Sequence, residues 1–327
     1  MQRVAGDMPS YKFNECVDDG LKNMIVVTGI YRSGTTITGK VIGSFKDIEY
    51  AYDPPLLFHF AYLRHLDRVK DSELLNLVKI YLYYDYYLNC LHGRYNLRVK
   101  DEGSCVLHMK PCKEVLEKLF AVDSVERAFS RDSNGRARFS FKFCNLYDLL
   151  ELLIDEYPKI KVVDMKRDLK RVLSSMMAKK WFFDESLKDD NAVLWPFYAL
   201  DGYVKTPYIV NESDLDLWNR LNNVSRTAYM CCKLAEKKIR FRDFIINNEK
   251  HGGMYLELKY EEFIANPIDQ VRIISDFTGA AWGDMTSQVV NTIKPSVSKC
   301  DINEFSKECD PDIWDRLIEL NNSLGYS

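Results

Sequence analysis

Short apolar runs rich in β-branched residues alternate along this chain with longer stretches in which apolar and charged residues recur at helical spacing. The short runs predict buried strands at residues 24–30, 48–53, 139–144, 159–167 and 253–260. The longer stretches predict helices at about 35–45, 74–91, 146–157, 168–182, 215–248 and 266–279. Strands that alternate with helices predict an α/β fold with a mainly parallel central sheet flanked by helices. Ligands of such folds bind at the carboxyl ends of the strands.

Two stretches depart from this alternation inside what we expect to be one domain, residues 1–327. Residues 56–138 predict helical insertions, and the aromatic-rich helix 74–91 within them predicts a stripe of core residues, with a substrate wall as the alternative. Residues 184–212 carry Pro, Gly and aromatic residues without a clear period, which is typical of a long loop or lid.

Composition narrows the class of protein. The 327 residues carry a formal net charge of −3, which argues against a general nucleic-acid binder. The nine cysteines are scattered without CxxC spacing, so we expect free thiols in a reducing compartment and neither disulfides nor a zinc site. The chain begins without an apolar signal segment and has no run of about 18 apolar residues. We therefore expect a soluble cytoplasmic protein without a membrane partner; its oligomeric state stays open.

The segment 24–44, "MIVVTGIYRSGTTITGKVIGS", combines a strand, a turn and the start of a helix. Gly29 and Gly34 permit sharp turns because glycine tolerates positive φ. The N–H groups of such a turn converge on an anion, and the following helix adds its positive end. A nucleoside triphosphate loop carries a lysine directly after its second glycine, but Thr35 stands here and the cation is Arg32. The loop therefore favours a single phosphate bearing one transferable group, with a plain strand-to-helix turn as the alternative.

A second cationic segment, "MKRDLKRVLSSMM", runs from a strand end into a helix. Arg167 lies at the carboxyl end of the strand, and Ser175 follows about two helical turns later. The two side chains could meet on one phosphate beside the sheet, or they could be a surface arginine and an ordinary helix serine. Together with the loop at residues 24–44, they indicate a nucleotide with two separated phosphates.

These segments resemble a family. "GIYRSGTT" resembles the 5′-phosphosulfate loop of sulfotransferases that use 3′-phosphoadenosine 5′-phosphosulfate (PAPS), in the form found in protein-tyrosine and many bacterial sulfotransferases. "MKRDLKRVLSS" is similar to their 3′-phosphate motif, and "FKFCNLYDLLELLIDEYPKIKVVDMKRD" is similar to the segment that leads from an active-site lysine into it. "YEEFIANP" resembles the stretch before their last core helix. The matches occur in family order over residues 24–279 and imply a P-loop-like sulfotransferase fold.

The resemblance implies a role for each matching residue. The residues implied to hold the 5′-phosphosulfate are Arg32, Ser33, Gly34, Thr35 and Thr36. Arg32 would also neutralise charge on the leaving phosphate oxygen, Arg167 and Ser175 would hold the 3′-phosphate, and Lys142 would point at the sulfonate or the bridging oxygen. Sulfonyl transfer, like phosphoryl transfer, has a loose in-line transition state, so positioning and cations should supply most of the catalysis.

The general base departs from the family pattern. Where cytosolic small-molecule sulfotransferases carry a histidine two residues after the strand lysine, this chain has Cys144. Asp53, just before two prolines, is the first candidate for the base, although a strand-end aspartate of no catalytic role is the alternative. Glu49 and His59 are the next candidates. An amine or an easily ionised hydroxyl as acceptor would require little base strength.

The C-terminal "KPSVSKC" lies where the family often closes a loop over the donor. It offers Lys294, Ser296, Ser298 and Lys299 as contacts, of which we select Lys299, with a solvated loop as the alternative. We expect the acceptor pocket to be framed by the helix 74–91, by "LLFHFAYLRHL" and by the loop 184–212.

The predicted activity is the transfer of the sulfonate of PAPS to a hydroxyl or amine of a small-molecule or sugar-like acceptor, with release of 3′-phosphoadenosine 5′-phosphate (PAP) and no metal requirement. By analogy alone it would belong to specialised metabolism. A P-loop kinase or NTPase is the first alternative, and the missing lysine after Gly34 argues against it. A non-catalytic PAP-binding protein is the second, and the presence of Arg32 and Lys142 argues against that.

Overall fold

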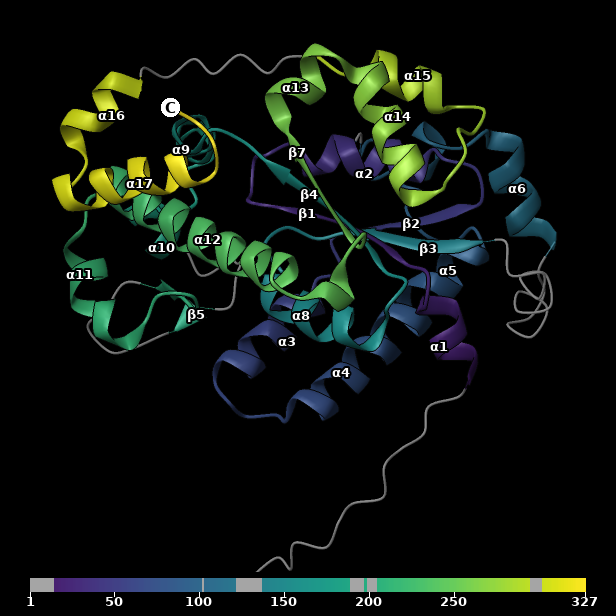
Figure 1. Ribbon diagram of the computed structural model, residues 1–327, viewed down its shortest axis with the longest axis horizontal. Helices are drawn as coiled ribbons and strands as arrows, with labels where there is room; N and C mark the ends of the chain where they lie inside the picture. The colour runs from purple at the N-terminus through teal and green to yellow at the C-terminus, as the bar shows by residue number, and fades with distance from the viewer. Residues whose placement is uncertain (1–14, 102, 122–136, 189–196, 199–204, 295–301) are drawn as a thin grey trace, which may run out of the picture.

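A five-stranded sheet forms the centre of the molecule (Figure 1). The computed structural model describes residues 15–101, 103–121, 137–188, 197–198, 205–294 and 302–327. The strands of the sheet are β1 (Ile25–Gly29), β2 (Ile48–Tyr52), β3 (Arg138–Lys142), β4 (Lys161–Lys166) and β7 (Tyr255–Lys259). Their order is β2-β3-β1-β4-β7, and every neighbouring pair is parallel. The predicted α/β class with a mainly parallel sheet is confirmed.

Both faces of the sheet are covered by helices, so successive residues of a strand enter two different cores. Val26 and Val162 pack into one core, whereas Ile25, Val27 and Val163 pack into the other. One face is covered by α2 (Thr35–Gly43), α13 (Tyr260–Ala265), α14 (Pro267–Thr278) and α15 (Thr286–Asn291) (Figure 1). The larger core on the opposite face includes residues of α8 (Tyr147–Glu156), α9 (Leu169–Met177), α12 (Asn223–Ile246) and α17 (Pro311–Ser323).

The described part of the insertion between β2 and β3 contains several helices. It contains α3 (Leu56–His65), α4 (Asp71–Ile80), the π-helix η1 (Tyr81–Tyr87), α5 (Leu88–Leu91), the 3₁₀ turn η2 (Val106–His108) and α6 (Cys112–Ala121). The remaining elements are α1 (Glu15–Leu21), α10 (Asp184–Lys188), β5 (Phe197–Tyr198), β6 (Thr206–Pro207), η3 (Glu212–Asp214), α11 (Leu215–Arg220), η4 (Glu249–His251) and α16 (Ile302–Glu308). Over the described ranges, no helix is both long and apolar enough to span a bilayer.

Three predicted helices differ from the observed ones. The helix expected at 215–248 is broken into α11 and α12, because Leu221 is extended and the Asn222 side chain accepts a hydrogen bond from the Ser225 N–H, which starts a new helix. The helix expected at 168–182 ends at Met177, shortly before Lys180 adopts a left-handed φ of 55°. The helix expected at 74–91 contains a π-helical segment.

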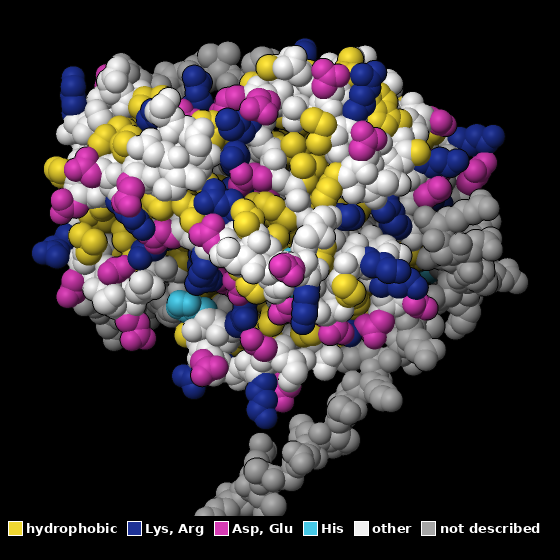
Figure 2. All heavy atoms as spheres, in the orientation of Figure 1, with side chains coloured by type: hydrophobic (Ala, Val, Ile, Leu, Met, Phe, Trp, Pro, Cys, Tyr) yellow, Lys and Arg dark blue, Asp and Glu magenta, His cyan; other side chains and the backbone are white. Residues whose placement is uncertain are grey.

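The predicted loop 184–212 is replaced in part by regular structure: α10, the start of η3, and an antiparallel pair formed by β5 and β6. Much of it, residues 189–196 and 199–204, lies outside the described residues. Figure 2 shows acidic and basic side chains interspersed over the visible face, which is consistent with the small net charge.

Candidate active site

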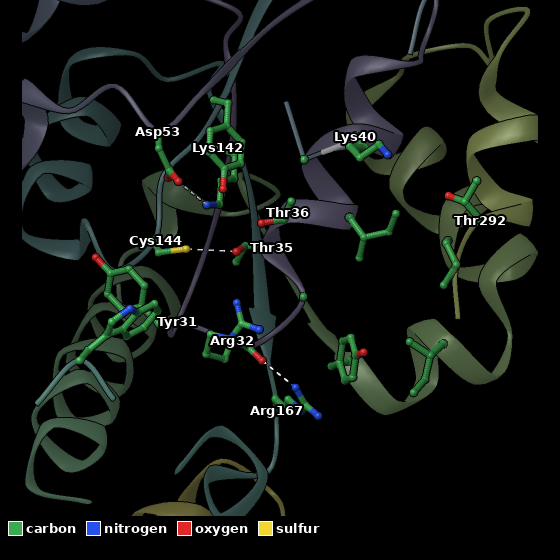
Figure 3. Close-up of a pocket in the computed structure, with 18 of the residues that line it drawn as sticks. Tyr31, Arg32, Thr35, Thr36, Lys40, Asp53, Lys142, Cys144, Arg167 and Thr292 are labelled. Atoms are coloured by element: carbon green, nitrogen blue, oxygen red, sulfur yellow. Dashed lines mark hydrogen bonds and ion pairs between the residues drawn. The ribbon is translucent and has the colours of Figure 1, made fainter. Parts of the chain in front are cut away.

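One cavity of about 860 Å³ lies at the carboxyl ends of the five strands (Figure 3). Each strand contributes at or just beyond its last residue, because parallel strands end at the same edge of the sheet. The residues that these strand ends place in its lining are Tyr31, Arg32, Gly34, Thr35, Thr36, Tyr52, Asp53, Lys142, Cys144, Arg167 and Tyr260. The fold therefore gathers most of the predicted site residues from four separate segments.

The loop after β1 has the backbone that its glycines predict. Gly29 has φ 152° and lies so close to β4 that a Cβ there would be 2.6 Å from the Met165 carbonyl oxygen. Gly34 has φ 92° and is the N-cap of α2, without a side-chain hydrogen bond to the helix end. The first N–H groups of a helix have no acceptor within it, so this end of α2 can bind an anion in the cavity. Arg32, with φ 68°, is the left-handed residue between the two glycines.

Thr35 occupies the position where a triphosphate loop has its lysine. Its hydroxyl lies 3.1 Å from the Cys144 thiol in the buried floor of the cavity. Burial raises the pKa of this thiol, so Cys144 is neutral at pH 7. Thr36, the next residue, is only partly buried and lines the cavity.

A lysine–aspartate pair lies beside the loop. Lys142 Nζ is 2.7 Å from Asp53 Oδ2 and 4.4 Å from the centre of the Tyr52 ring. The Lys142 side chain is only 4 % exposed, and that of Asp53 is 32 % exposed. Burial disfavours the ammonium, but the negative charges that Cys144 and Asp53 can carry outweigh it, and the pKa of Lys142 is raised. Because Cys144 is neutral at pH 7, the Asp53 carboxylate is the group that keeps Lys142 charged.

Arg167 supports the loop from β4. Its Nη1 donates a 2.8 Å hydrogen bond to the Arg32 carbonyl oxygen, and its guanidinium lies 4.4 Å from the centre of the Tyr260 ring. The Arg32 side chain is exposed, and its Nε donates to Ser175 Oγ at 2.9 Å. Arg32, Arg167 and Ser175 thus form one cluster, in which Ser175 contacts Arg32.

The remaining candidate residues divide between the cavity and other places in the fold. Ser33 is fully buried, and its hydroxyl has no hydrogen-bond partner within the described part of the chain. Glu49 is buried and pairs with Lys118 of α6, away from the cavity. His59 is exposed on α3 and does line the cavity. Lys299 lies outside the described residues, whereas Lys294 lines the cavity.

The aromatic helix 74–91 does not line the cavity. Its side chains, including Tyr83 and Tyr87, are part of the core, so the core-stripe interpretation holds and the substrate wall is wrong for the residues that the structure describes. The segment "LLFHFAYLRHL", by contrast, does contribute to the lining through Phe58 and His59.

The apolar residues of the lining divide into two sets. Tyr31, Phe58 and Trp181 pack against the core on one side of the sheet, with the Tyr31 and Trp181 rings 6.0 Å apart. On the opposite side the lining residues that pack together are Ile37, Tyr260, Ile264 and Ile293. In Figure 3, Asp53, Cys144 and Tyr31 lie on one side of Arg32, and Lys40 and Thr292 lie on the other. The position of Tyr260 at a strand end could have indicated its place, but the contacts of Trp181 and Ile293 depend on the folded chain.

Comparison with known proteins gives likeness to solved structures alone. No protein-family model matches the chain, and the comparison with curated proteins found no match. A sulfotransferase from Mycobacterium tuberculosis H37Rv shares 14 % identity with a TM-score of 0.43, covering 90 % of this chain and 78 % of that one. A sulfotransferase from Mycobacterium avium shares 12 % identity with a TM-score of 0.48, covering 96 % and 79 %. The sulfotransferase domain from the curacin biosynthetic pathway shares 11 % identity with a TM-score of 0.46, covering 94 % and 99 %.

These three solved structures are sulfotransferases. Within the described ranges, no three His, Cys, Asp or Glu side chains come together as a metal site.

Proposed function

We propose that this chain transfers the sulfonate of PAPS to a hydroxyl or amine of a small-molecule or sugar-like acceptor and releases PAP. The observation that carries the proposal is the placement of three cations, Arg32, Lys142 and Arg167, in one cavity around the start of α2. They come from three different strand ends, so they can contact anionic groups at different places on one ligand. A nucleotide with a 3′-phosphate and a 5′-phosphosulfate has such groups.

The loop supports a phosphosulfate more than a triphosphate. In a triphosphate loop the lysine after the second glycine reaches the β- and γ-phosphates. Thr35 stands there, and its hydroxyl is directed to Cys144. The cations are supplied instead by Arg32 from within the loop and by Lys142 from β3. These positions suit one phosphate joined to one sulfonate.

The donor contacts follow from this placement. The N–H groups at the start of α2, with Thr35 and Thr36, would hold the 5′-phosphosulfate, and Arg32 would face its bridging oxygen. Arg167 would hold the 3′-phosphate. Ser175 would join it once PAPS binds, because Arg32 would then contact the 5′-phosphosulfate and release the Ser175 hydroxyl. Ser33 would shape the loop from within, since its N–H donates to the Ile30 carbonyl oxygen at 3.2 Å.

Transfer requires charge stabilisation on the donor side and proton removal on the acceptor side. Arg32 and Lys142 would stabilise the charge that develops as the bond from sulfur to the phosphate oxygen breaks and the bond from sulfur to the acceptor forms. The raised pKa of Lys142 keeps its ammonium charged for this task. Asp53 would take the acceptor proton on Oδ1, since its Oδ2 is bonded to Lys142, with His59 as the alternative base.

The apolar lining fits the two ends of this reaction. The slot formed by Ile37, Tyr260 and Ile293 would suit a flat nucleobase, because it offers apolar and aromatic surface next to Arg167. Tyr31 and Trp181 lie on the other side, with Asp53, where the acceptor would enter.

Ligand binding is the first test. A ligand at 100 times its Kd raises the free energy of unfolding by roughly 2.7 kcal/mol, so saturating PAP should raise the Tm clearly. Mg-ATP at the same concentration serves as the matched ligand for a kinase or NTPase. A Tm that rises with Mg-ATP and not with PAP would contradict the proposal.

Transfer is the second test. Radiolabelled sulfonate should pass from PAPS to members of a panel of phenols, alcohols, amines and sugars. Lys142→Ala should abolish this transfer, whereas Lys113→Ala, which alters an 87 % exposed side chain on α6, should leave it unchanged. PAP binding without transfer to any acceptor in the panel would indicate the non-catalytic binding protein instead.

A further inference from the structure

The turn that carries Asp53 begins with one backbone anchor on β3, because the Asp53 N–H donates to the Lys142 carbonyl oxygen at 2.9 Å. Asp53 has φ 39°, a left-handed conformation that is unfavourable for a residue with a side chain. It precedes Pro54, and the residue before a proline prefers an extended conformation. Pro54 and Pro55 have no N–H to donate. Contacts from neighbouring elements therefore add to the Asp53–Lys142 backbone bond in keeping this strained turn in place.

Two tyrosine hydroxyls hold the two ends of this turn. Before it, the Tyr95 hydroxyl donates to the Tyr52 carbonyl oxygen at 2.9 Å. After it, the Leu56 N–H donates to the Tyr81 hydroxyl oxygen at 3.1 Å.

A third tyrosine joins these two anchors. The hydroxyls of Tyr81 and Tyr86 lie 3.0 Å apart, and their rings meet edge to face at 5.1 Å. Tyr86 also packs edge to face against Tyr95, again with 5.1 Å between ring centres. Burial raises the pKa of all three hydroxyls, so all of them keep their protons and their hydrogen bonds at ordinary pH.

The π-helix η1 accounts for this arrangement. Tyr81 and Tyr86 are five residues apart, and in an α-helix they would point about 140° away from each other. In a π-helix, which bonds residue i to residue i+5, they lie on the same side. The π-helical segment thus places both hydroxyls next to the Asp53 turn, although none of its residues lines the cavity.

We propose that Tyr81, Tyr86 and Tyr95 form a tyrosine clamp that positions Asp53 against Lys142 and so sets the geometry of the acceptor side of the cavity. The clamp residues are positioning residues, because they act on the acceptor only through Asp53. The catalytic consequence of the clamp rests on the role given to Asp53 under the proposed function; its effect on the Asp53–Lys142 pair does not.

The reactivity of Lys142 reports on the clamp without any donor or acceptor. The titratable groups whose charges act on Lys142 are Asp53, Cys144 and Tyr52. If Asp53 leaves, burial remains and lowers the pH at which Lys142 loses its proton. Competitive labelling with acetic anhydride across a pH series, read by mass spectrometry against the exposed Lys113, follows that change.

Asp53→Asn sets the scale of the experiment. Loss of an opposite charge at this distance should move the Lys142 labelling profile to lower pH by roughly one to three units. The variants Tyr81→Phe and Tyr95→Phe each delete one anchoring hydroxyl, and their combination should move the profile in the same direction by about one unit. Tyr84→Phe, also in η1 but 47 % exposed, is the matched control and should leave the profile in place.

Two results would overturn the clamp. One is a Lys142 labelling profile that stays in place in Tyr81→Phe/Tyr95→Phe but moves in Asp53→Asn. The double variant is measured at a temperature where circular dichroism shows that it is folded. The other is an equal shift in Tyr84→Phe. If the double variant does not fold, the two single variants give the same decision. The affinity for PAP, measured in parallel, should change less than about twofold in the clamp variants. If the wild-type protein does not bind PAP, the proposed function is refuted, but the labelling result still decides whether the clamp holds Asp53.

Discussion

Replacing Arg167 by alanine tests whether the end of β4 holds a phosphate. In the free protein the contacts of Arg167 that the variant loses include the 2.8 Å hydrogen bond to the Arg32 carbonyl oxygen and the stacking on the Tyr260 ring at 4.4 Å. The first contributes about 1 kcal/mol, and the second about 0.5–1 kcal/mol. We therefore expect the free energy of unfolding to fall by about 2 kcal/mol, which urea denaturation measures.

The effect on binding should be separate and larger. A hydrogen bond to a charged group contributes about 1.5–3 kcal/mol, so loss of the contact to a 3′-phosphate should raise the Kd for PAP about 10- to 150-fold. Adenosine 5′-phosphate, which lacks the 3′-phosphate, is the matched ligand. Its Kd should change much less in Arg167→Ala, because adenosine 5′-phosphate has no 3′-phosphate and therefore has no contact with Arg167 to lose.

Isothermal titration calorimetry with both ligands separates this contact from general damage. The wild-type protein should prefer PAP, and Arg167→Ala should lose most of that preference. Arg171→Ala removes the same charge from an exposed position in the first turn of α9 and should keep it. Equal losses for PAP and adenosine 5′-phosphate would refute the assignment, because they would show that Arg167 only supports the loop.

Two further predictions concern the loop and the buried pair. Gly34→Ala should destabilise the protein by roughly 2 kcal/mol, because a left-handed φ is strained for alanine and a Cβ would lie 2.5 Å from the Tyr260 ring. Gly253 is the control: it has φ 76° but open space around it, so Gly253→Ala should cost only about 1 kcal/mol. Equal losses of unfolding free energy in urea denaturation would contradict the close approach of Gly34 to Tyr260. Lys142→Met should cost about 2 kcal/mol at neutral pH, below the value for a fully buried pair because Asp53 is partly exposed. Since the folded-state pKa of Lys142 is raised, this contribution is fully present below the unfolded-state pKa of about 10.4 and is lost as the pH rises through the folded-state pKa. The wild-type and variant unfolding curves should therefore differ constantly from about pH 6 to about pH 9 and approach each other above about pH 10.4; a difference that persists unchanged at higher pH would count against the ion pair.

Local signals in the sequence determined most of the fold around the site. The short apolar run 24–30, rich in β-branched residues, predicted a buried strand. Gly29 and Gly34 marked the turns because their backbone angles are open mainly to glycine. Asn266, Pro267 and Gly279 marked the ends of α14 in the same way, since capping depends on residues within one helical turn. The alternation of strands and helices then implied that Arg32, Asp53, Lys142 and Arg167 would meet at one edge of a parallel sheet.

Only the tertiary structure decided which side chain contacts which. From the sequence, Ser33 was grouped with Thr36 as a donor contact, and Glu49 followed Asp53 as a candidate base. In the structure Ser33 is fully buried, and Glu49 pairs with Lys118 of α6. Ser175, expected beside Arg167, bonds to Arg32. Such choices depend on contacts between residues far apart in the chain, which hydrophobic periodicity does not encode.

The aromatic segment 74–91 shows most clearly which features followed from the sequence and which depended on the tertiary structure. Its spacing indicated a buried helix, and it is one, because burial needs only an apolar face. Whether that helix would take a π-helical segment, and bring Tyr81 and Tyr86 together beside the Asp53 turn, depended on the packing of the folded chain. The sequence determined the strands, the loop and the cations, since these follow from local propensity and strand order. The tertiary structure alone decided how Asp53 is held, because that requires three tyrosines from two other segments to meet around one turn.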